Sequence, residues 1–321
     1  MPTFEAMNTG FLIAGLTPME RDKVLAFVRD AENTFSRFSA TSTISTINNS
    51  KGQWVEINPL TLQLLKDSIA AYYDTDGLFN PFLGEVMHKL GYHQSFEKLT
   101  SITALDDQTW RSRCNKPALP APTEQLPLYL DFDEHNHRVR LDQAVSLDLG
   151  GIAKGWVAQQ ACERLQLDGV SSGLIDAGGD IILWGQEPRQ KLWGVGVAHP
   201  FEKGSDIADL WLEGLTAIAT SSIVKRHWKT ADNYNVHHII DPRTNEPSSS
   251  DLIQVTILAR NLVVAEQYAK CLLILGSSVG VPWIATKRAD LAYIAVRGDG
   301  RIVTSQNLPT YCSDLEVAAH A

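Results

Sequence analysis

One short run of the sequence, residues 146–155, most restricts what this chain can fold into. It predicts a strand ending at Asp148, a turn at Gly150 and Gly151, and a helix with Lys154 in its first turn. Glycines let a backbone approach a ligand closely, and the start of a helix offers free N–H groups and the positive end of its dipole. The run therefore predicts a seat for a phosphate ester, although an ordinary strand-to-helix connection has the same pattern.

Apolar spacing elsewhere predicts a mixture of helices and strands. Thr17 and Asn58 each precede a proline, which is typical of a helix start, and helical spacing then extends to Phe35 and to Asp76. Two further helices are expected over 262–275 and 278–287, and a proline-rich surface loop over 117–127. Strands are expected at 128–133, 139–141, 174–183, 192–198, 210–220, 253–259, 291–296 and 301–304.

This order of elements indicates the α+β class. No composition shift or flexible linker divides the chain, so we expect one domain over residues 1–321. Mixed and antiparallel sheets flanked by helices would form its body, and residues 50–125 a smaller helical lobe.

Charge and composition narrow the function classes. With 28 basic and 37 acidic residues the net charge is −9, which argues against binding to nucleic acid or to an anionic membrane. The four cysteines form no CxxC pair, so a zinc site is not expected. No run approaches the roughly 18 apolar residues of a membrane span. The sequence shows no secretory leader or lipid-attachment cysteine, so a cytoplasmic location is expected, with a trimmed leader as the alternative.

A series of motifs occurs along nearly the whole chain. In order, these are Met7–Gly10, Phe35–Phe38, Asp76–Pro81, Ser146–Gly155, Asp176–Asp180, Ala219–Ser222, His237–Thr244 and Ala265–Lys270. In this order they resemble the ApbE family, the FAD:protein FMN transferases. The segments DLGGIAKG, AGGD and HHIIDP carry the resemblance most specifically.

The resemblance implies a reaction and its partners. An ApbE enzyme breaks the pyrophosphate of FAD, moves the FMN half onto a threonine or serine hydroxyl of a target protein, and releases AMP. Such a transfer depends mainly on positioning and on neutralising charge. The expected partners are therefore FAD and a protein that presents Thr or Ser.

The resemblance also implies ligand contacts. Asp148 and Lys154 match positions that contact FAD; as alternatives, Asp148 would cap the helix and Lys154 would be a solvated first-turn residue. Asn80 stands where the family usually has aspartate. The other positions implied to contact the cofactor, each of which could instead serve the core or a strand end, are Met7, Phe38, Leu78, Phe79, Thr220 and Ile240.

His238 is the expected catalytic base. It holds the place of the histidine that precedes Ile-Ile-Asp-Pro in the family, and histidine titrates near neutrality. His237 is its neighbour, and Asp241 either assists or only shapes the following turn.

The expected metal site departs from the family. Relatives bind Mg²⁺ with an aspartate, a threonine four residues later and backbone carbonyls; this chain has Glu266, Lys270 and the carbonyl of Gly151. A protonated lysine cannot ligate a cation. Three interpretations follow. Glu266 and Lys270 form a helical ion pair, or the Lys270 ammonium takes the place of Mg²⁺, or metal binding and catalysis are both lost.

The sequence thus predicts an FMN transferase with an atypical metal site. Lys154 and Lys270 would handle phosphate, His238 would be the base and Asp148 would orient the ligand. Two alternatives stay open: a non-catalytic FAD-binding protein, and an FAD pyrophosphatase that uses water as the acceptor.

Overall fold

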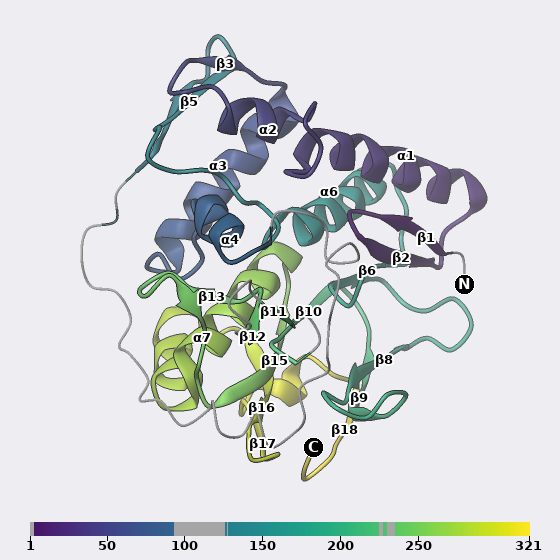
Figure 1. Cartoon of the computed structure of the whole chain (residues 1–321). Helices are drawn as coiled ribbons and strands as arrows, with labels where there is room; N and C mark the ends of the chain where they lie inside the picture. Colours follow the sequence, from purple (N-terminus) through teal and green to yellow (C-terminus); the bar gives the residue numbers. More distant parts are fainter. Residues whose placement is uncertain (1–2, 93–125, 127, 225–226, 230–234) are drawn as a thin grey trace.

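An eight-stranded antiparallel sheet forms the body of the computed structural model, which describes residues 3–92, 126, 128–224, 227–229 and 235–321 (Figure 1). Its strand order is β1-β2-β6-β7-β10-β15-β16-β17. The strands are β1 (Thr3–Ala6), β2 (Thr9–Ala14), β6 (Gly173–Ala177), β7 (Ile181–Trp184), β10 (Thr216–Ser222), β15 (Leu252–Ala259), β16 (Ala292–Arg297) and β17 (Ile302–Thr304). Strand β15 lies between β10 and β16 in this sheet and is buried along its whole length, as a strand covered on both faces must be.

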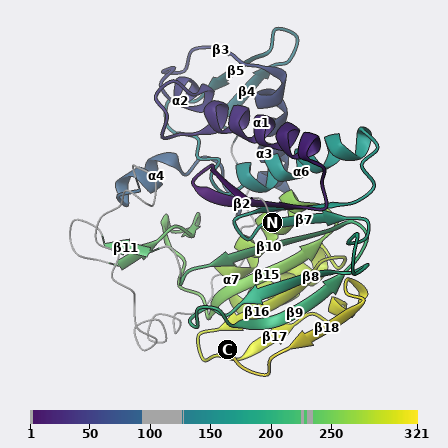
Figure 2. The same ribbon diagram turned by 90° about the vertical axis from the view of Figure 1, so that its right-hand side faces the viewer.

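Smaller sheets lie beside this body. A three-stranded sheet of order β18-β9-β8 lies next to the C-terminal strands, and β3-β5-β4 forms another at the opposite end of the molecule (Figure 2). Two short hairpins, β11-β12 and β13-β14, follow β10 in sequence. Their bounds are β3 (Val55–Glu56), β4 (Leu130–Asp133), β5 (Arg138–Leu141), β8 (Trp193–Ala198), β9 (Asp206–Leu212), β11 (His227–Lys229), β12 (Asn235–His237), β13 (Ile240–Asp241), β14 (Glu246–Pro247) and β18 (Asp314–Val317).

Helices α1 and α3 begin where the sequence predicts. In α1 the Thr17 side chain accepts from the N–H of Glu20 while the Glu20 carboxylate accepts from Thr17, which makes a reciprocal cap. In α3 the Asn58 side chain accepts from the N–H of Thr61. The helices are α1 (Pro18–Phe35), α2 (Thr43–Asn48), α3 (Pro59–Asp74), α4 (Gly84–Lys89), α6 (Ala153–Leu167), α7 (Leu262–Lys287) and the short 3₁₀ helix η2 (Leu308–Thr310).

Helix α7 is kinked and mostly buried. Gly276 has φ 77° and ψ 174°, so the two expected helices follow one another with a break at this residue. By length and composition α7 could cross a membrane, and half of its apolar window is buried in this structure. The core helix of a soluble protein passes the same test, so this is weak evidence, and the expected absence of a span is not confirmed.

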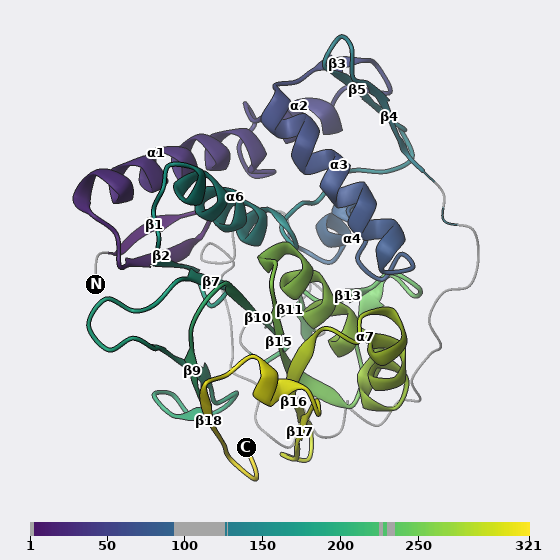
Figure 3. The ribbon, with the colours of Figure 1, turned by 180° about the vertical axis from the view of Figure 1, so that it is seen from behind.

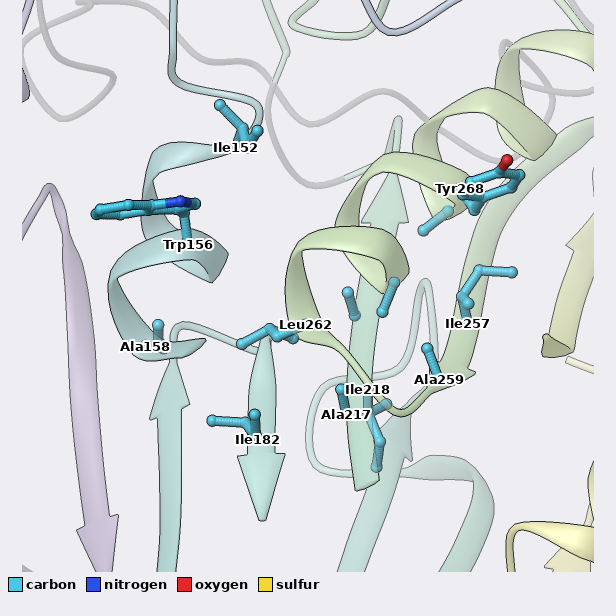
Figure 4. Close-up of a cluster of buried hydrophobic side chains, with 14 of the residues drawn as sticks. Ile152, Trp156, Ala158, Ile182, Ala217, Ile218, Ile257, Ala259, Leu262 and Tyr268 are labelled. Atoms are coloured by element: carbon cyan, nitrogen blue, oxygen red, sulfur yellow. The ribbon is translucent and has the colours of Figure 1, made fainter. Parts of the chain in front are cut away.

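The core joins α6 and α7 to the large sheet. Side chains from both helices face those of β7, β10 and β15 (Figure 4). Labelled members of this cluster are Ile152, Trp156, Ala158, Ile182, Ala217, Ile218, Ile257, Ala259, Leu262 and Tyr268. Because both helices start against the sheet, the first turn of α6 lies beside the first turns of α7.

Three strand predictions were wrong in detail. The expected strand 174–183 is two strands, because Gly178 and Gly179 turn the chain with φ 76° and 97°. The expected strand 210–220 is also two, parted at Gly214 with φ 70°. The expected strand before Asp148 is reduced to an isolated parallel bridge between Ser146 and Leu83, and the Asp148 N–H donates to the Pro81 carbonyl at 2.8 Å.

The expected lobe at 50–125 is helical only in part. Its described residues form α3 and α4, but β3 pairs with β5, so a small sheet caps this end (Figure 3). Residues 93–125, and with them most of the expected loop 117–127, lie outside the described residues. The α+β class is confirmed, and the single-domain organisation stays a prediction.

Candidate functional site

A cavity of about 490 Å³ lies where the large sheet, the starts of α6 and α7 and the loop after α3 meet. This volume is within the range of small-molecule and cofactor sites. Every site residue predicted from the sequence is in its wall, namely Met7, Phe38, Leu78, Phe79, Asn80, Asp148, Gly151, Lys154, Thr220, His238, Ile240, Glu266 and Lys270. The structure therefore brings together residues from across the sequence, and their individual roles stay predictions.

The glycine turn is held by Asp148. Its Oδ1 accepts from the N–H of Gly150 at 2.8 Å, and its Oδ2 lies 3.2 Å from Nε of Arg37. Both carboxylate oxygens thus have partners within the protein. Asp148 does not cap α6, whose N-cap is Ile152 without a side-chain hydrogen bond; it fixes the preceding turn instead.

Arg37 is a site residue that the sequence analysis missed. It lines the cavity, donates from Nη1 to the carbonyl of Tyr92 at 2.9 Å, and lies over the rings of Phe38 and Tyr92 at 4.3 and 4.8 Å from their centroids. The signal was present, because an arginine between two aromatic residues in the Phe35–Phe38 motif is well placed for cation–π contact.

Lys154 belongs to a buried charge cluster. Its Nζ lies 2.6 Å from Oδ2 of Asp180 and 3.2 Å from Oε1 of Glu266, and these three side chains are only 14, 9 and 6% exposed. Lys154 is thus not a solvated surface residue. Burial raises the pKa of Asp180, and the charge of Lys154 opposes this shift. Asp180 was missed as a site residue although its motif was recognised.

Glu266 occupies the start of helix α6. Its Oε2 accepts from the N–H of Gly155 at 3.1 Å, one of the free donors of the first turn. A Cβ at position 155 would lie only 2.5 Å from this oxygen, so a larger residue here would require the Glu266 carboxylate to shift. The Glu266 carboxylate therefore occupies part of the helix start at which the sequence predicts a bound phosphate.

Lys270 points to the glycine turn. Its Nζ donates to the carbonyl oxygen of Gly151 at 3.0 Å and lies 5.8 Å from the ring centroid of Phe79. Among the described side chains no carboxylate lies within ion-pairing distance of it, so the i,i+4 ion pair with Glu266, one of the three interpretations, is not formed. The reason is tertiary, because Lys154 and Gly155 hold Glu266. Burial lowers the pKa of Lys270, while Glu266 opposes the shift.

The two adjacent histidines differ in their surroundings. His237 is buried; its Nε2 donates to the carbonyl of Ser248 at 2.9 Å, and its Nδ1 accepts from the N–H of Ile239 at 3.3 Å. This pattern fits the neutral ring and leaves it no role as a base. His238, between β12 and β13, lines the cavity instead.

Asp241 has a structural role. Its carboxylate accepts from the guanidinium of Arg243 at 2.8 and 2.6 Å and from the Arg243 N–H at 3.0 Å. It therefore shapes the turn after β13, as one of the two sequence interpretations holds.

The remaining predicted residues pack in the core and also line the cavity. Leu78 and Phe79 are buried, and Phe79 N–H donates to Oγ1 of Thr75 at 3.0 Å. Asn80 accepts from the N–H of Phe82 at 2.8 Å, and Thr220 shares a hydrogen bond with Thr256 at 2.9 Å. These contacts fix the cavity wall before any ligand enters.

The donors present do not fit Mg²⁺. Among the described residues no group of three or more His, Cys, Asp or Glu is arranged to hold a metal ion. The Gly151 carbonyl already accepts from an ammonium, and both oxygens of Glu266 are bonded within the protein. A cation placed here would meet the positive charge of Lys270 rather than an oxygen ligand.

Fold and cavity together define an α+β protein with a deep cofactor-sized cavity, apolar at one side and charged where two helices begin. The family model described as the ApbE family matches residues 7–295. The chain belongs to the ApbE family.

Similar proteins agree with this assignment. An FAD:protein FMN transferase of Klebsiella pneumoniae is 27% identical over 288 residues, covering 88% of this chain and 84% of that protein. One of Vibrio cholerae is 24% identical over 281 residues, covering 88% and 80%. Among solved structures, the ApbE protein of Thermotoga maritima superposes with a TM-score of 0.78 at 24% identity, over 98% of this chain and 99% of that one. The flavin transferase ApbE of Vibrio cholerae gives 0.73 at 19%, over 97% and 98%.

Proposed function

We propose that this protein is an FAD:protein FMN transferase that moves FMN from FAD to a Thr or Ser hydroxyl of a target protein and releases AMP. Family membership over residues 7–295 and the names of the relatives support this proposal. The structural observation that carries it is the shared cavity, in which apolar residues and a cation meet at the start of α6. A dinucleotide with a planar ring system and an anionic centre has that distribution of properties.

Lys270 is the proposed phosphate-binding cation. It lacks a carboxylate partner among the described side chains, whereas Lys154 is shared by Asp180 and Glu266. An ammonium in a largely buried site without a direct carboxylate contact interacts strongly with an anion. Lys154 keeps Glu266 neutralised, so that this carboxylate does not repel the pyrophosphate.

We propose further that Lys270 takes the place that Mg²⁺ has in relatives. In those enzymes the metal would neutralise charge on the phosphates. Here the ammonium lies on the Gly151 carbonyl, one of the oxygens that the family uses for metal binding. FAD binding by the wild type should therefore be independent of Mg²⁺.

His238 is the proposed base. It would take the proton of the acceptor hydroxyl while that oxygen bonds to the phosphorus of the FMN half. The bond from this phosphorus to the bridging oxygen breaks, and AMP leaves with the bridging oxygen. Histidine suits this role near neutral pH, and His237 fixes the backbone beside it.

A second candidate is a non-catalytic FAD-binding protein. The contact between Lys270 and Gly151 supports it too, because a fixed ammonium can hold a dinucleotide without activating it. A pyrophosphatase differs from both, since it would consume FAD without a protein acceptor.

Each of these functions requires that the protein binds FAD. Calorimetry of FAD binding, with Mg²⁺ and then with EDTA, tests this requirement. We expect binding that neither addition changes, and a wild type that binds no FAD would overturn the proposal. Incubation with FAD alone then detects hydrolysis, and the mass of a target protein detects transfer.

A further inference from the structure

Strand β8 has one edge without a strand partner. In its sheet of order β18-β9-β8 it pairs only with β9, and no described strand pairs with its other side. An unpaired edge presents backbone N–H and C=O groups that can bind another extended chain.

This free edge lies in the wall of the cavity. Four consecutive residues, Val195–Ala198, line it. Side chains of a strand alternate between its two faces, and here Val195 and Val197 are buried while Gly196 and Ala198 are exposed. A cavity over one face of a strand contacts only every second side chain. A cavity that contacts four consecutive residues is therefore more readily placed along the edge of the strand, where the backbone groups lie.

The directions of the backbone groups follow from two hydrogen bonds. The N–H of His199 donates to the carbonyl of Ser205, which directly precedes β9, so the backbone groups of His199 point toward β9. The carbonyl of Ala198 accepts from Nε2 of Gln254 at 2.8 Å, so Ala198 faces away. Alternation then directs the N–H and C=O of Gly196 and Gly194 to the free edge as well.

Gln254 adds an independent sign of a missing partner. Its side chain is 1% exposed and lines the cavity beside Ala198, and its Oε1 has no hydrogen-bond partner among the residues that the structure describes. A buried acceptor without a donor is costly. An incoming N–H group would relieve that cost.

We propose that the free edge of β8 binds the acceptor segment of the target protein as an added strand. This rests on the proposed function, which requires a polypeptide hydroxyl to enter this cavity. Strand addition obtains affinity from main-chain hydrogen bonds, with side chains alternating between the edge's two sides. An extended segment bound here delivers its Thr or Ser into the space lined by His238 and Lys270.

The spacing of the edge favours a polypeptide over part of FAD. Outward groups recur at every second residue, about 7 Å apart, and a partner strand has the same repeat. At Gly194 the solvent-facing side of the edge is open, since a Cβ there would meet no atom within 4 Å, whereas at Gly196 the Asp206 carboxylate covers that side.

A matched pair of variants tests the edge. Ala198→Pro removes an outward N–H and keeps the bonds to β9, whereas Ala198→Val adds similar bulk and keeps the N–H. The probe is a library of short synthetic peptides, each with one central threonine, incubated with FAD and the full chain; labelled peptides are found by the mass of FMN. For the best peptide we expect Ala198→Pro to raise KM about three- to tenfold. Ala198→Val keeps the N–H and should therefore raise KM less than Ala198→Pro does, and the two variants should have the same Kd for FAD.

A second measurement uses only the wild type, so it does not depend on the folding of a variant. The best peptide is methylated at each backbone nitrogen in turn. Strand addition predicts an alternating loss of labelling, because only every second N–H faces β8.

Three results would overturn the proposal: equal effects of the Pro and Val variants, a weaker Kd for FAD with unchanged peptide KM, or methylation effects without alternation. Failure of the proposed function looks different, because the wild type then binds no FAD, or binds FAD and labels no peptide at all.

Discussion

The ammonium of Lys270 donates a hydrogen bond to the carbonyl oxygen of Gly151 across 3.0 Å, and so joins the first turns of α7 to the glycine turn before α6. The two residues are 119 positions apart in sequence. A positive charge is therefore fixed where the backbone approaches the cavity. This contact explains how a lysine fits a position at which the resemblance implies a metal ligand.

Removing the charge of Lys270 should weaken FAD binding. Lys270→Met keeps most of the apolar stem, so the loss reflects the ammonium; a hydrogen bond to a charged group contributes about 1.5–3 kcal/mol, or about ten- to a hundredfold in Kd. Calorimetry measures this. Lys66→Met is the control, because Lys66 forms an exposed pair with Glu134 far along the chain from the site. Equal affinity of wild type and Lys270→Met would exclude a phosphate role for Lys270.

The double variant Glu266→Asp with Lys270→Thr should create Mg²⁺ dependence. It restores the aspartate and threonine of the family pattern and frees the Gly151 carbonyl for a cation. FAD affinity should then rise when Mg²⁺ is added and fall with EDTA. If the wild type already needs Mg²⁺ for FAD binding or for transfer, the idea that lysine substitutes for the metal is lost.

Gly151→Ala should displace the ammonium without unfolding the protein. A Cβ at this position would collide with Nζ of Lys270, but a flexible side-chain end can move. We expect FAD affinity to fall about tenfold and the unfolding free energy to change by less than about 1 kcal/mol. Gly194→Ala serves as control, since no atom lies within 4 Å of its added Cβ. A loss of stability as large as the loss of binding would contradict this account.

Local signals made the helices predictable. Thr17 and Asn58 were recognised as caps because a cap depends on residues within four positions. The breaks at Gly178 and Gly214 were not placed, since the apolar runs continue on both sides of these glycines. The positive φ angles that separate these strands occur at single residues, so they hardly change the apolar periodicity of the sequence.

The sequence predicted which residues line the site, but not which of their side chains pair with one another. Motif positions identified the lining residues, including Glu266 and Lys270. Helical spacing favoured a pair between these two, yet Glu266 bonds Lys154, 112 residues away. A partner brought by the tertiary fold thus replaced the local one. Arg37 was missed for the same reason, because its partner Asp148 is distant in sequence.

Breaking the pair of Arg37 and Asp148 should destabilise the fold at the glycine turn. Arg37→Met leaves the Asp148 carboxylate, 11% exposed, without its cation. Loss of one partner of a largely buried pair costs about 1–3 kcal/mol, measurable by chemical denaturation. Arg37→Met with Asp148→Asn should recover part of this loss because the buried charge is gone. If the double variant is no more stable than Arg37→Met, the pair does not determine the stability of the turn.

The pKa of Asp176 should make stability fall as pH rises through mildly acidic values. Burial raises this pKa above its ordinary value of 3.8, and hydrogen bonds from the N–H groups of Gly179 and Gly178 offset the shift only in part. Between the two pKa values the folded state binds more protons than the unfolded state, so the unfolding free energy decreases with pH. Asp176→Asn should remove that contribution, because an amide does not titrate. Denaturation of wild type and variant across this range measures the difference, and parallel curves would show that burial of Asp176 is not linked to stability.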